Sequence, residues 1–100
     1  MNRIDLKIRR NVLKDEATSI AHFMAKKVID NEEASIQVED DKEEDVWDIY
    51  NAYKEDKNTS GETIVIACCT RGRGGRVYEY KYHREEQLEG ILYEFFKKEI

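Results

Sequence analysis

Residues 63–83, TIVIACCTRGRGGRVYEYKYH, contain the pattern that decides the fold. Residues 63–69 are apolar on both faces of an extended chain, which is typical of a central strand covered on both sides or of a strand at a dimer contact. The glycine-rich residues 70–76 predict a chain reversal, and residues 77–83 then return as a second strand. One face of that strand carries Tyr78, Tyr80 and Tyr82. We expect a helix to cover these tyrosines, because the opposite face is already polar.

The segments on either side of residues 63–83 predict two more strands and two helices. Alternating apolar and charged residues predict a strand over residues 3–9, and a short strand follows over residues 34–39. A helix is predicted between them, over residues 13–29, with Asn31 just beyond its end. Its apolar stripe comprises Leu13, Ala17, Ile20, Met24 and Val28. A last helix is predicted over residues 85–98, with these buried residues: Leu88, Ile91, Leu92 and Phe95.

The acidic segment between residues 41 and 55 is predicted to be a third helix. Its apolar residues have the spacing i, i+3, i+4, i+7: Val46, Ile49, Tyr50 and Tyr53. At about 100° per residue, five acids gather on the opposite arc, namely Asp41, Glu44, Asp45, Asp48 and Glu55. Trp47 lies at the border between the two faces.

These elements predict one α+β domain spanning residues 1–100, in the order β-α-β-α-β-β-α. A small, mostly antiparallel or mixed sheet is expected to pack against the helices. The pattern leaves open whether the first strand pairs with the second or with the fourth. Ten aromatic residues and 40% hydrophobic residues argue against a disordered chain.

The charge of the chain is sorted along its length. The net charge of −5 is the sum of +3 for residues 1–31, −8 for residues 32–57 and zero for residues 58–100. Such sorting creates a directional field that can orient a partner. The charged N-terminus and the shortness of the longest apolar run, residues 64–69, predict no signal peptide and no membrane partner. The adjacent Cys68 and Cys69 read as thiols in a reducing compartment, so a cytoplasmic location is expected.

The acidic helical face is the first candidate binding site. Carboxylates about 5–6 Å apart along a helix can compete for a basic nucleic-acid groove or face any basic protein patch, and an aromatic such as Trp47 is common in interface hot spots. The leading hypothesis is a non-enzymatic protein that binds a larger protein with a basic surface or a basic nucleic-acid groove. Small, acidic, proline-free α+β chains are similar in general character to phage-encoded inhibitors of bacterial defence, although no motif indicates a family. The alternative is an ordinary solvated helix face.

The second candidate site is an anion-binding hairpin tip with Arg71, Arg73 and Arg76. Glycine amides and arginine forks can hold phosphate oxygens, which suggests a small RNA- or nucleotide-binding protein. Nucleic acid is a secondary expectation, because the chain is negative overall. The alternative is a soluble hairpin whose arginines prevent edge pairing. A third hypothesis is a homo-oligomeric structural protein, with residues 63–69 at a twofold interface.

Residues suited to catalysis or metal binding are sparse. Cys68 and Cys69 are adjacent, whereas zinc sites separate paired cysteines by two to four residues, so a metal site with His83 is not expected. His22 falls within the predicted first helix, and no base that would activate a cysteine is identifiable. We therefore expect no catalytic residues, no metal and no cofactor.

Overall fold

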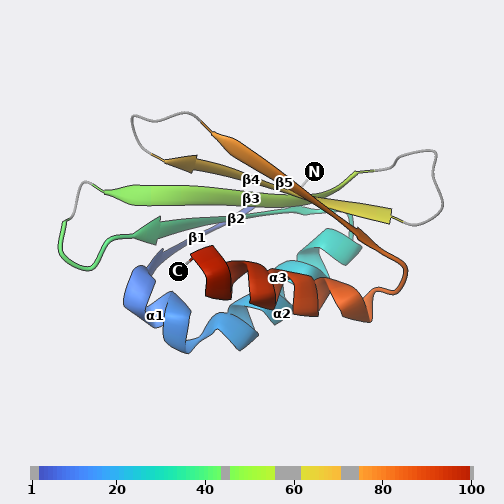
Figure 1. The fold of residues 1–100 in the computed structure, drawn as a ribbon, viewed down its shortest axis with the longest axis horizontal. Helices are drawn as coiled ribbons and strands as arrows, with labels where there is room; N and C mark the ends of the chain where they lie inside the picture. Colours follow the sequence, from blue (N-terminus) through green and yellow to red (C-terminus); the bar gives the residue numbers. More distant parts are fainter. Residues whose placement is uncertain (1–2, 44–45, 56–61, 71–74, 100) are drawn as a thin grey trace.

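The computed structural model describes residues 3–43, 46–55, 62–70 and 75–99. The chain runs in the order β1, α1, α2, β2, β3, β4, β5, α3 (Figure 1). The strands are β1 (Arg3–Arg9), β2 (Glu33–Glu39), β3 (Trp47–Glu55), β4 (Glu62–Thr70) and β5 (Arg76–Tyr82). The helices are α1 (Arg10–Asp15), α2 (Ala17–Ile29) and α3 (Glu86–Glu99).

The five strands form one mixed sheet in the order β1-β2-β3-β4-β5. β1 and β2 are parallel, because α1 and α2 carry the chain back between them. The other neighbours are antiparallel. The first strand therefore pairs with the second, and the predicted α+β class with a mixed sheet is confirmed.

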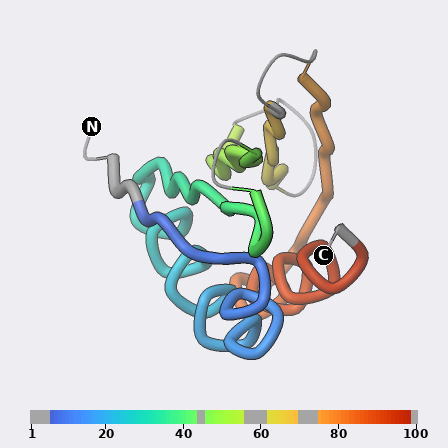
Figure 2. Tube along the Cα trace, turned by 90° about the vertical axis from the view of Figure 1, so that its left-hand side faces the viewer, coloured from blue at the N-terminus to red at the C-terminus, as the bar shows by residue number. Residues whose placement is uncertain are grey.

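All three helices lie on one face of the sheet, which we call the inner face (Figure 1). Seen along the strands, α1 and α2 lie beneath the β1 side and α3 lies nearer β5 (Figure 2). Side chains paired in register share a face, so the row Ile36, Tyr50 and Cys68 faces the helices. On the opposite, outer face, no helix of the described segments covers the sheet (Figure 1). β4 is thus an internal strand with helices on one side only.

The core lies between the inner face and the helices. The predicted stripe of α2 is buried along its whole length, and α3 contributes Leu88, Leu92, Phe95 and Phe96. Tyr50 is 1% exposed, and its ring makes edge-to-face contacts with Phe95 and Phe96, each with centroids 5.7 Å apart. Tyr78 and Tyr80 also contact Phe95, which confirms that α3 covers the tyrosine face.

The predicted acidic helix is wrong, because residues 47–55 form the central strand β3. They pair with β2 on one side and with β4 on the other. The segment has aromatic and β-branched residues that suit a strand, and its apolar positions fit both periods. Hydrogen bonding to the strands that precede and follow it in the chain, β2 and β4, decides between them. The element order is therefore β-α-α-β-β-β-β-α.

The N-terminal helical region starts earlier than predicted and is divided at Glu16, where φ is −111° and ψ is 23°. α2 ends at the predicted place. Asn31 has a φ of 61°, its N–H donates to the carbonyl of Val28, and the N–H of Glu32 donates to the carbonyl of Lys27. These two bonds define a Schellman cap. Within the described residues, no helix is long and apolar enough to cross a membrane.

Candidate protein-binding face

The acids predicted to form one binding arc are divided between a turn and the two faces of the sheet. Because β3 is a strand, successive side chains point to opposite faces. Asp48 shares the inner face with Tyr50, whereas Trp47 and Glu55 lie on the outer face. Asp41 lies in the connection between β2 and β3. The other two predicted residues lie outside the described segments: Glu44 and Asp45.

Asp48 makes a structural ion pair. The Nη2 group of Arg10 donates to Asp48 Oδ2 at 2.9 Å, and the two side chains are 28% and 17% exposed, respectively. Arg10 is the first residue of α1, so the pair joins the start of the helical layer to the central strand. Asp48 therefore does not face solvent as part of an acidic binding surface.

The acids before β3 also make internal contacts. Asp40 Oδ1 accepts hydrogen bonds from the backbone N–H groups of Lys42, at 2.8 Å, and Glu43, at 3.0 Å. These two bonds are the main reason that the pKa of Asp40 is held below its ordinary value. The backbone N–H of Asn11, in the first turn of α1, donates to Asp41 Oδ1 at 3.2 Å. Asp40 thus stabilises the turn before β3, and Asp41 joins this turn to α1 by a hydrogen bond.

The outer face carries an apolar patch across β3, β4 and β5. The register aligns three rows of outward side chains: Ile49 with Cys69, Asn51 with Ala67 and Val77, and Tyr53 with Val65 and Glu79. We define the outer apolar patch as Trp47, Ile49, Tyr53, Val65, Ala67 and Val77. The first two strands instead present polar residues on this face, including Lys7, Arg9, Gln37 and Glu39.

Exposure varies strongly within the outer apolar patch. Val77 is 65% exposed and Tyr53 is 38% exposed, whereas Val65 is only 2% exposed. The register neighbours of Val65 on this face are Tyr53 and Glu79, whose longer side chains flank it. Single exposed apolar residues are routine, but a contiguous set on a helix-free sheet face is typical of an interaction surface. The period-two signal of Trp47, Ile49 and Tyr53 was present in the sequence, although helical spacing overlapped it.

The described part of the hairpin provides one of the three predicted anion-binding arginines. Arg71 and Arg73 lie outside the described residues. Arg76 starts β5, and its guanidinium lies over the Tyr78 ring, 6.0 Å from the centroid. Its register partner is Cys68, so Arg76 is on the inner-face side of the sheet. Tyr78 and Tyr80, further along the same strand, pack beneath α3 against Phe95.

The thiols and histidines occupy separate environments. Cys68 is buried and Cys69 is exposed, and neither is in a disulfide. Burial is the largest cause of the raised pKa of Cys68, with the charge of Asp48 next, so the protonated thiol is favoured over the nucleophilic thiolate. His22 Nδ1 lies 2.9 Å from Glu89 Oε2, between α2 and α3. Within the described segments, no group of three His, Cys, Asp or Glu side chains is arranged to hold a metal ion.

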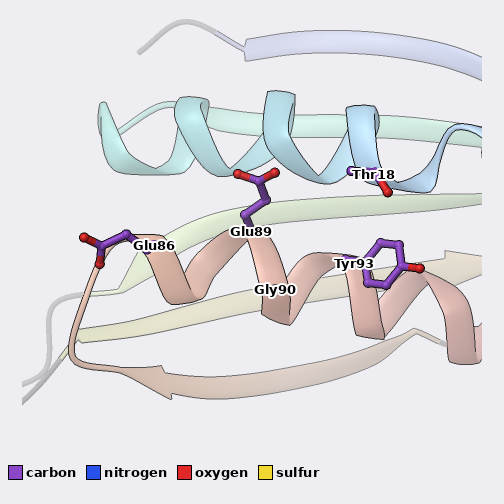
Figure 3. Close-up of a pocket in the computed structure, with 5 residues that line it drawn as sticks. All are labelled: Thr18, Glu86, Glu89, Gly90 and Tyr93. Atoms are coloured by element: carbon purple, nitrogen blue, oxygen red, sulfur yellow. The ribbon is translucent and has the colours of Figure 1, made fainter.

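A groove of about 360 Å³ lies between α2 and α3, on the side away from the sheet (Figure 3). Its lining residues are Thr18, Glu86, Glu89, Gly90 and Tyr93. A Cβ atom added at Gly90 would meet nothing within 4 Å, so the groove is open there. Two observations account for the acidic residues of this groove without a bound ligand. Glu89 already pairs with His22, and acids are favoured near the start of a helix such as α3.

Comparison with known proteins identifies no relative: no family model, curated protein or solved structure matches the chain.

Proposed function

We propose that this protein is a non-enzymatic protein-binding module that contacts its partner through the outer apolar patch. The observation that carries the proposal is the contrast between the two faces of one sheet. Three helices cover the inner face (Figure 1). The register of the strands places aromatic and aliphatic side chains of β3, β4 and β5 on the outer face. Burying such side chains in a complex removes apolar surface from water, which is the main favourable contribution to protein association.

The chemistry of the patch suits a protein partner. Trp47 and Tyr53 are of the residue types that are enriched in interface hot spots. Glu79 and Lys81 on β5, with Lys7 and Arg9 on β1, provide charged residues around the apolar centre. An apolar centre within a polar rim is the usual anatomy of a protein interface. Charge mimicry of nucleic acid is not part of this proposal, because the acids do not form one helical arc.

Val77 offers the sharpest test, because it is the most exposed large hydrophobic residue of the patch. We expect Val77→Lys to reduce capture of the partner from a lysate of the source organism by roughly 10-fold or more, since an ammonium group would have to be desolvated in the interface. Val12→Lys is the matched control. Val12 is also an exposed valine, 40% exposed, but it lies on α1.

Both variants should retain the far-UV circular dichroism and the urea midpoint of the original protein within the small change typical of surface substitutions. Equal capture by Val77→Lys and Val12→Lys would contradict the assignment of the patch. Reversing Asp48 to Lys is a poor test, because it would place a cation against Arg10 and destabilise the fold itself.

A further inference from the structure

One position in the groove between α2 and α3 is not explained by the fold. Gly90 lies in the interior of α3, where glycine is less favourable than alanine because it loses more conformational freedom on folding. A Cβ atom added there would meet nothing within 4 Å, so close packing does not require glycine. The absence of a side chain leaves a groove of about 360 Å³ open at this point.

The groove has two chemically different ends. Figure 3 shows Glu86 toward one end and Tyr93 toward the other, with Glu89 pointing from α3 toward α2 between them. The ammonium group of Lys97 lies 5.0 Å from the centroid of the Tyr93 ring, so the aromatic end is already next to a cation of the chain. A positively charged ligand group is therefore favoured at the end with the two glutamates.

The two glutamates keep carboxylate oxygens that a ligand can reach. Glu89 is 42% exposed, and its Oε2 is engaged by His22 Nδ1 at 2.9 Å, which leaves Oε1 for a ligand. Glu86 is exposed and makes no ion pair within the described segments. Lys26 lies one turn after His22 on the same side of α2. In the part of the chain that the structure describes, it forms no ion pair with either glutamate.

Two carboxylates three residues apart on one helix suit a guanidinium group. Their Cβ atoms lie about 5–6 Å apart, and arginine offers five N–H donors in a planar fork that can engage both carboxylates. A divalent cation would need more oxygen ligands. Within the described residues, no group of three His, Cys, Asp or Glu side chains could hold one. The aliphatic part of an arginine side chain can lie along an apolar surface such as the open backbone at Gly90.

We infer that the groove between α2 and α3 binds an arginine side chain of a protein partner, with the guanidinium at Glu86 and Glu89 and the aliphatic stem over Gly90. The volume of about 360 Å³ is near the lower end of ligand pockets, roughly 300–1,000 Å³, which suits a single long side chain. The site lies on the side of the helices away from the sheet (Figure 3). It is therefore separate from the outer apolar patch and goes beyond the proposed function.

The test is an NMR titration of the isotope-labelled full chain with the peptide acetyl-Gly-Arg-Gly-amide at low ionic strength. The backbone amide signals of Thr18, Glu89 and Gly90 should move and saturate, with a dissociation constant on the order of 1–10 mM, since partly exposed ion pairs contribute little each. The signal of Val77, on the outer face, should not move. The same peptide with citrulline, which is neutral and of similar shape, should bind at least about 10-fold more weakly, because its hydrogen bonds lack the charge. A lysine peptide should also bind more weakly, because an ammonium group has no planar fork.

Matched variants separate the groove from the fold. Gly90→Leu places a side chain in the groove and should weaken binding of the arginine peptide by roughly 10-fold or more, while the urea midpoint is kept or raised. Gly90→Ala is the milder variant and decides the question if leucine disturbs the fold. Glu86→Gln should weaken binding by roughly threefold, whereas Glu85→Gln should not, because Glu85 is an exposed acid that does not line the groove. Lys26→Gln should strengthen binding, because it removes a competing cation.

Unchanged signals up to about 50 mM peptide, several-fold above the expected dissociation constant, would overturn the inference. Equal binding of the citrulline peptide would also overturn it, as would equal binding by the original protein and the Gly90 variants. Equal affinity for the lysine peptide would overturn the assignment to arginine. Val77→Lys should leave the titration unchanged, so failure of this site is distinguishable from failure of the outer apolar patch.

Discussion

Replacing two tyrosines of β3 separately by alanine distinguishes the strand from the helix that the local pattern predicts. In a helix, Tyr50 and Tyr53 would lie on one apolar stripe and both would be buried. In the strand they point to opposite faces: Tyr50 is 1% exposed beneath α3, and Tyr53 is 38% exposed on the outer face. The same substitution three residues apart should therefore have unequal effects on stability.

The expected difference follows from burial and ring contacts. A buried aromatic side chain removes about 150–250 Å² from water, and truncation of such a residue to alanine costs about 3–5 kcal/mol. Tyr50 also loses edge-to-face contacts with Phe95 and Phe96, each contributing about 0.5–1.5 kcal/mol. We therefore expect Tyr50→Ala to cost about 4–5 kcal/mol. Tyr53→Ala should cost about 1–2 kcal/mol, because its side chain remains partly solvated and lacks these contacts.

The assay is urea unfolding followed by circular dichroism, which gives the free energy of unfolding of each variant. Tyr50→Phe serves as a control that keeps the ring and should cost less than half as much as Tyr50→Ala. Equal destabilisation by Tyr50→Ala and Tyr53→Ala would refute the strand and the assignment of faces.

Other predictions concern single local features. Gly90→Ala should stabilise the protein by about 0.5–1 kcal/mol in urea unfolding, because the site is an open helix interior where alanine is favoured; destabilisation would mean that the groove is not open. Asn31→Gly should preserve the Schellman cap, whereas Asn31→Val should lower the unfolding midpoint, since a β-branched residue disfavours positive φ. The pKa of Glu62 is lowered first by the Tyr82 hydroxyl and then by Lys54. This contribution is present above the unfolded pKa and is lost as pH falls through the lower folded pKa, so Tyr82→Phe should flatten the acid side of the stability–pH curve.

Most secondary structure could be predicted from local patterns. The alternation in β1 and β5, the stripe of α2 and the buried face of α3 each fit one period and not the other, whereas β4 was predicted from a short continuous apolar run beside a glycine-rich turn. The prediction that a helix covers the tyrosine face of β5 followed from the polar residues on the other face of that strand. The candidate site could not be predicted in the same way, because it depended on the acidic segment, where both periods fit.

The sequence by itself determined which face of β1, β5, α2 and α3 is buried, because that information repeats every two or every three to four residues. It also determined the concentration of acids between residues 32 and 56. Tertiary structure decided the role of those acids. β3 forms because its backbone groups pair with both β2 and β4, and the side-chain pattern within one segment does not encode hydrogen bonds to its neighbouring strands. The same pairing turns Asp48 inward to Arg10 and leaves Tyr53 on the face that we propose binds a partner.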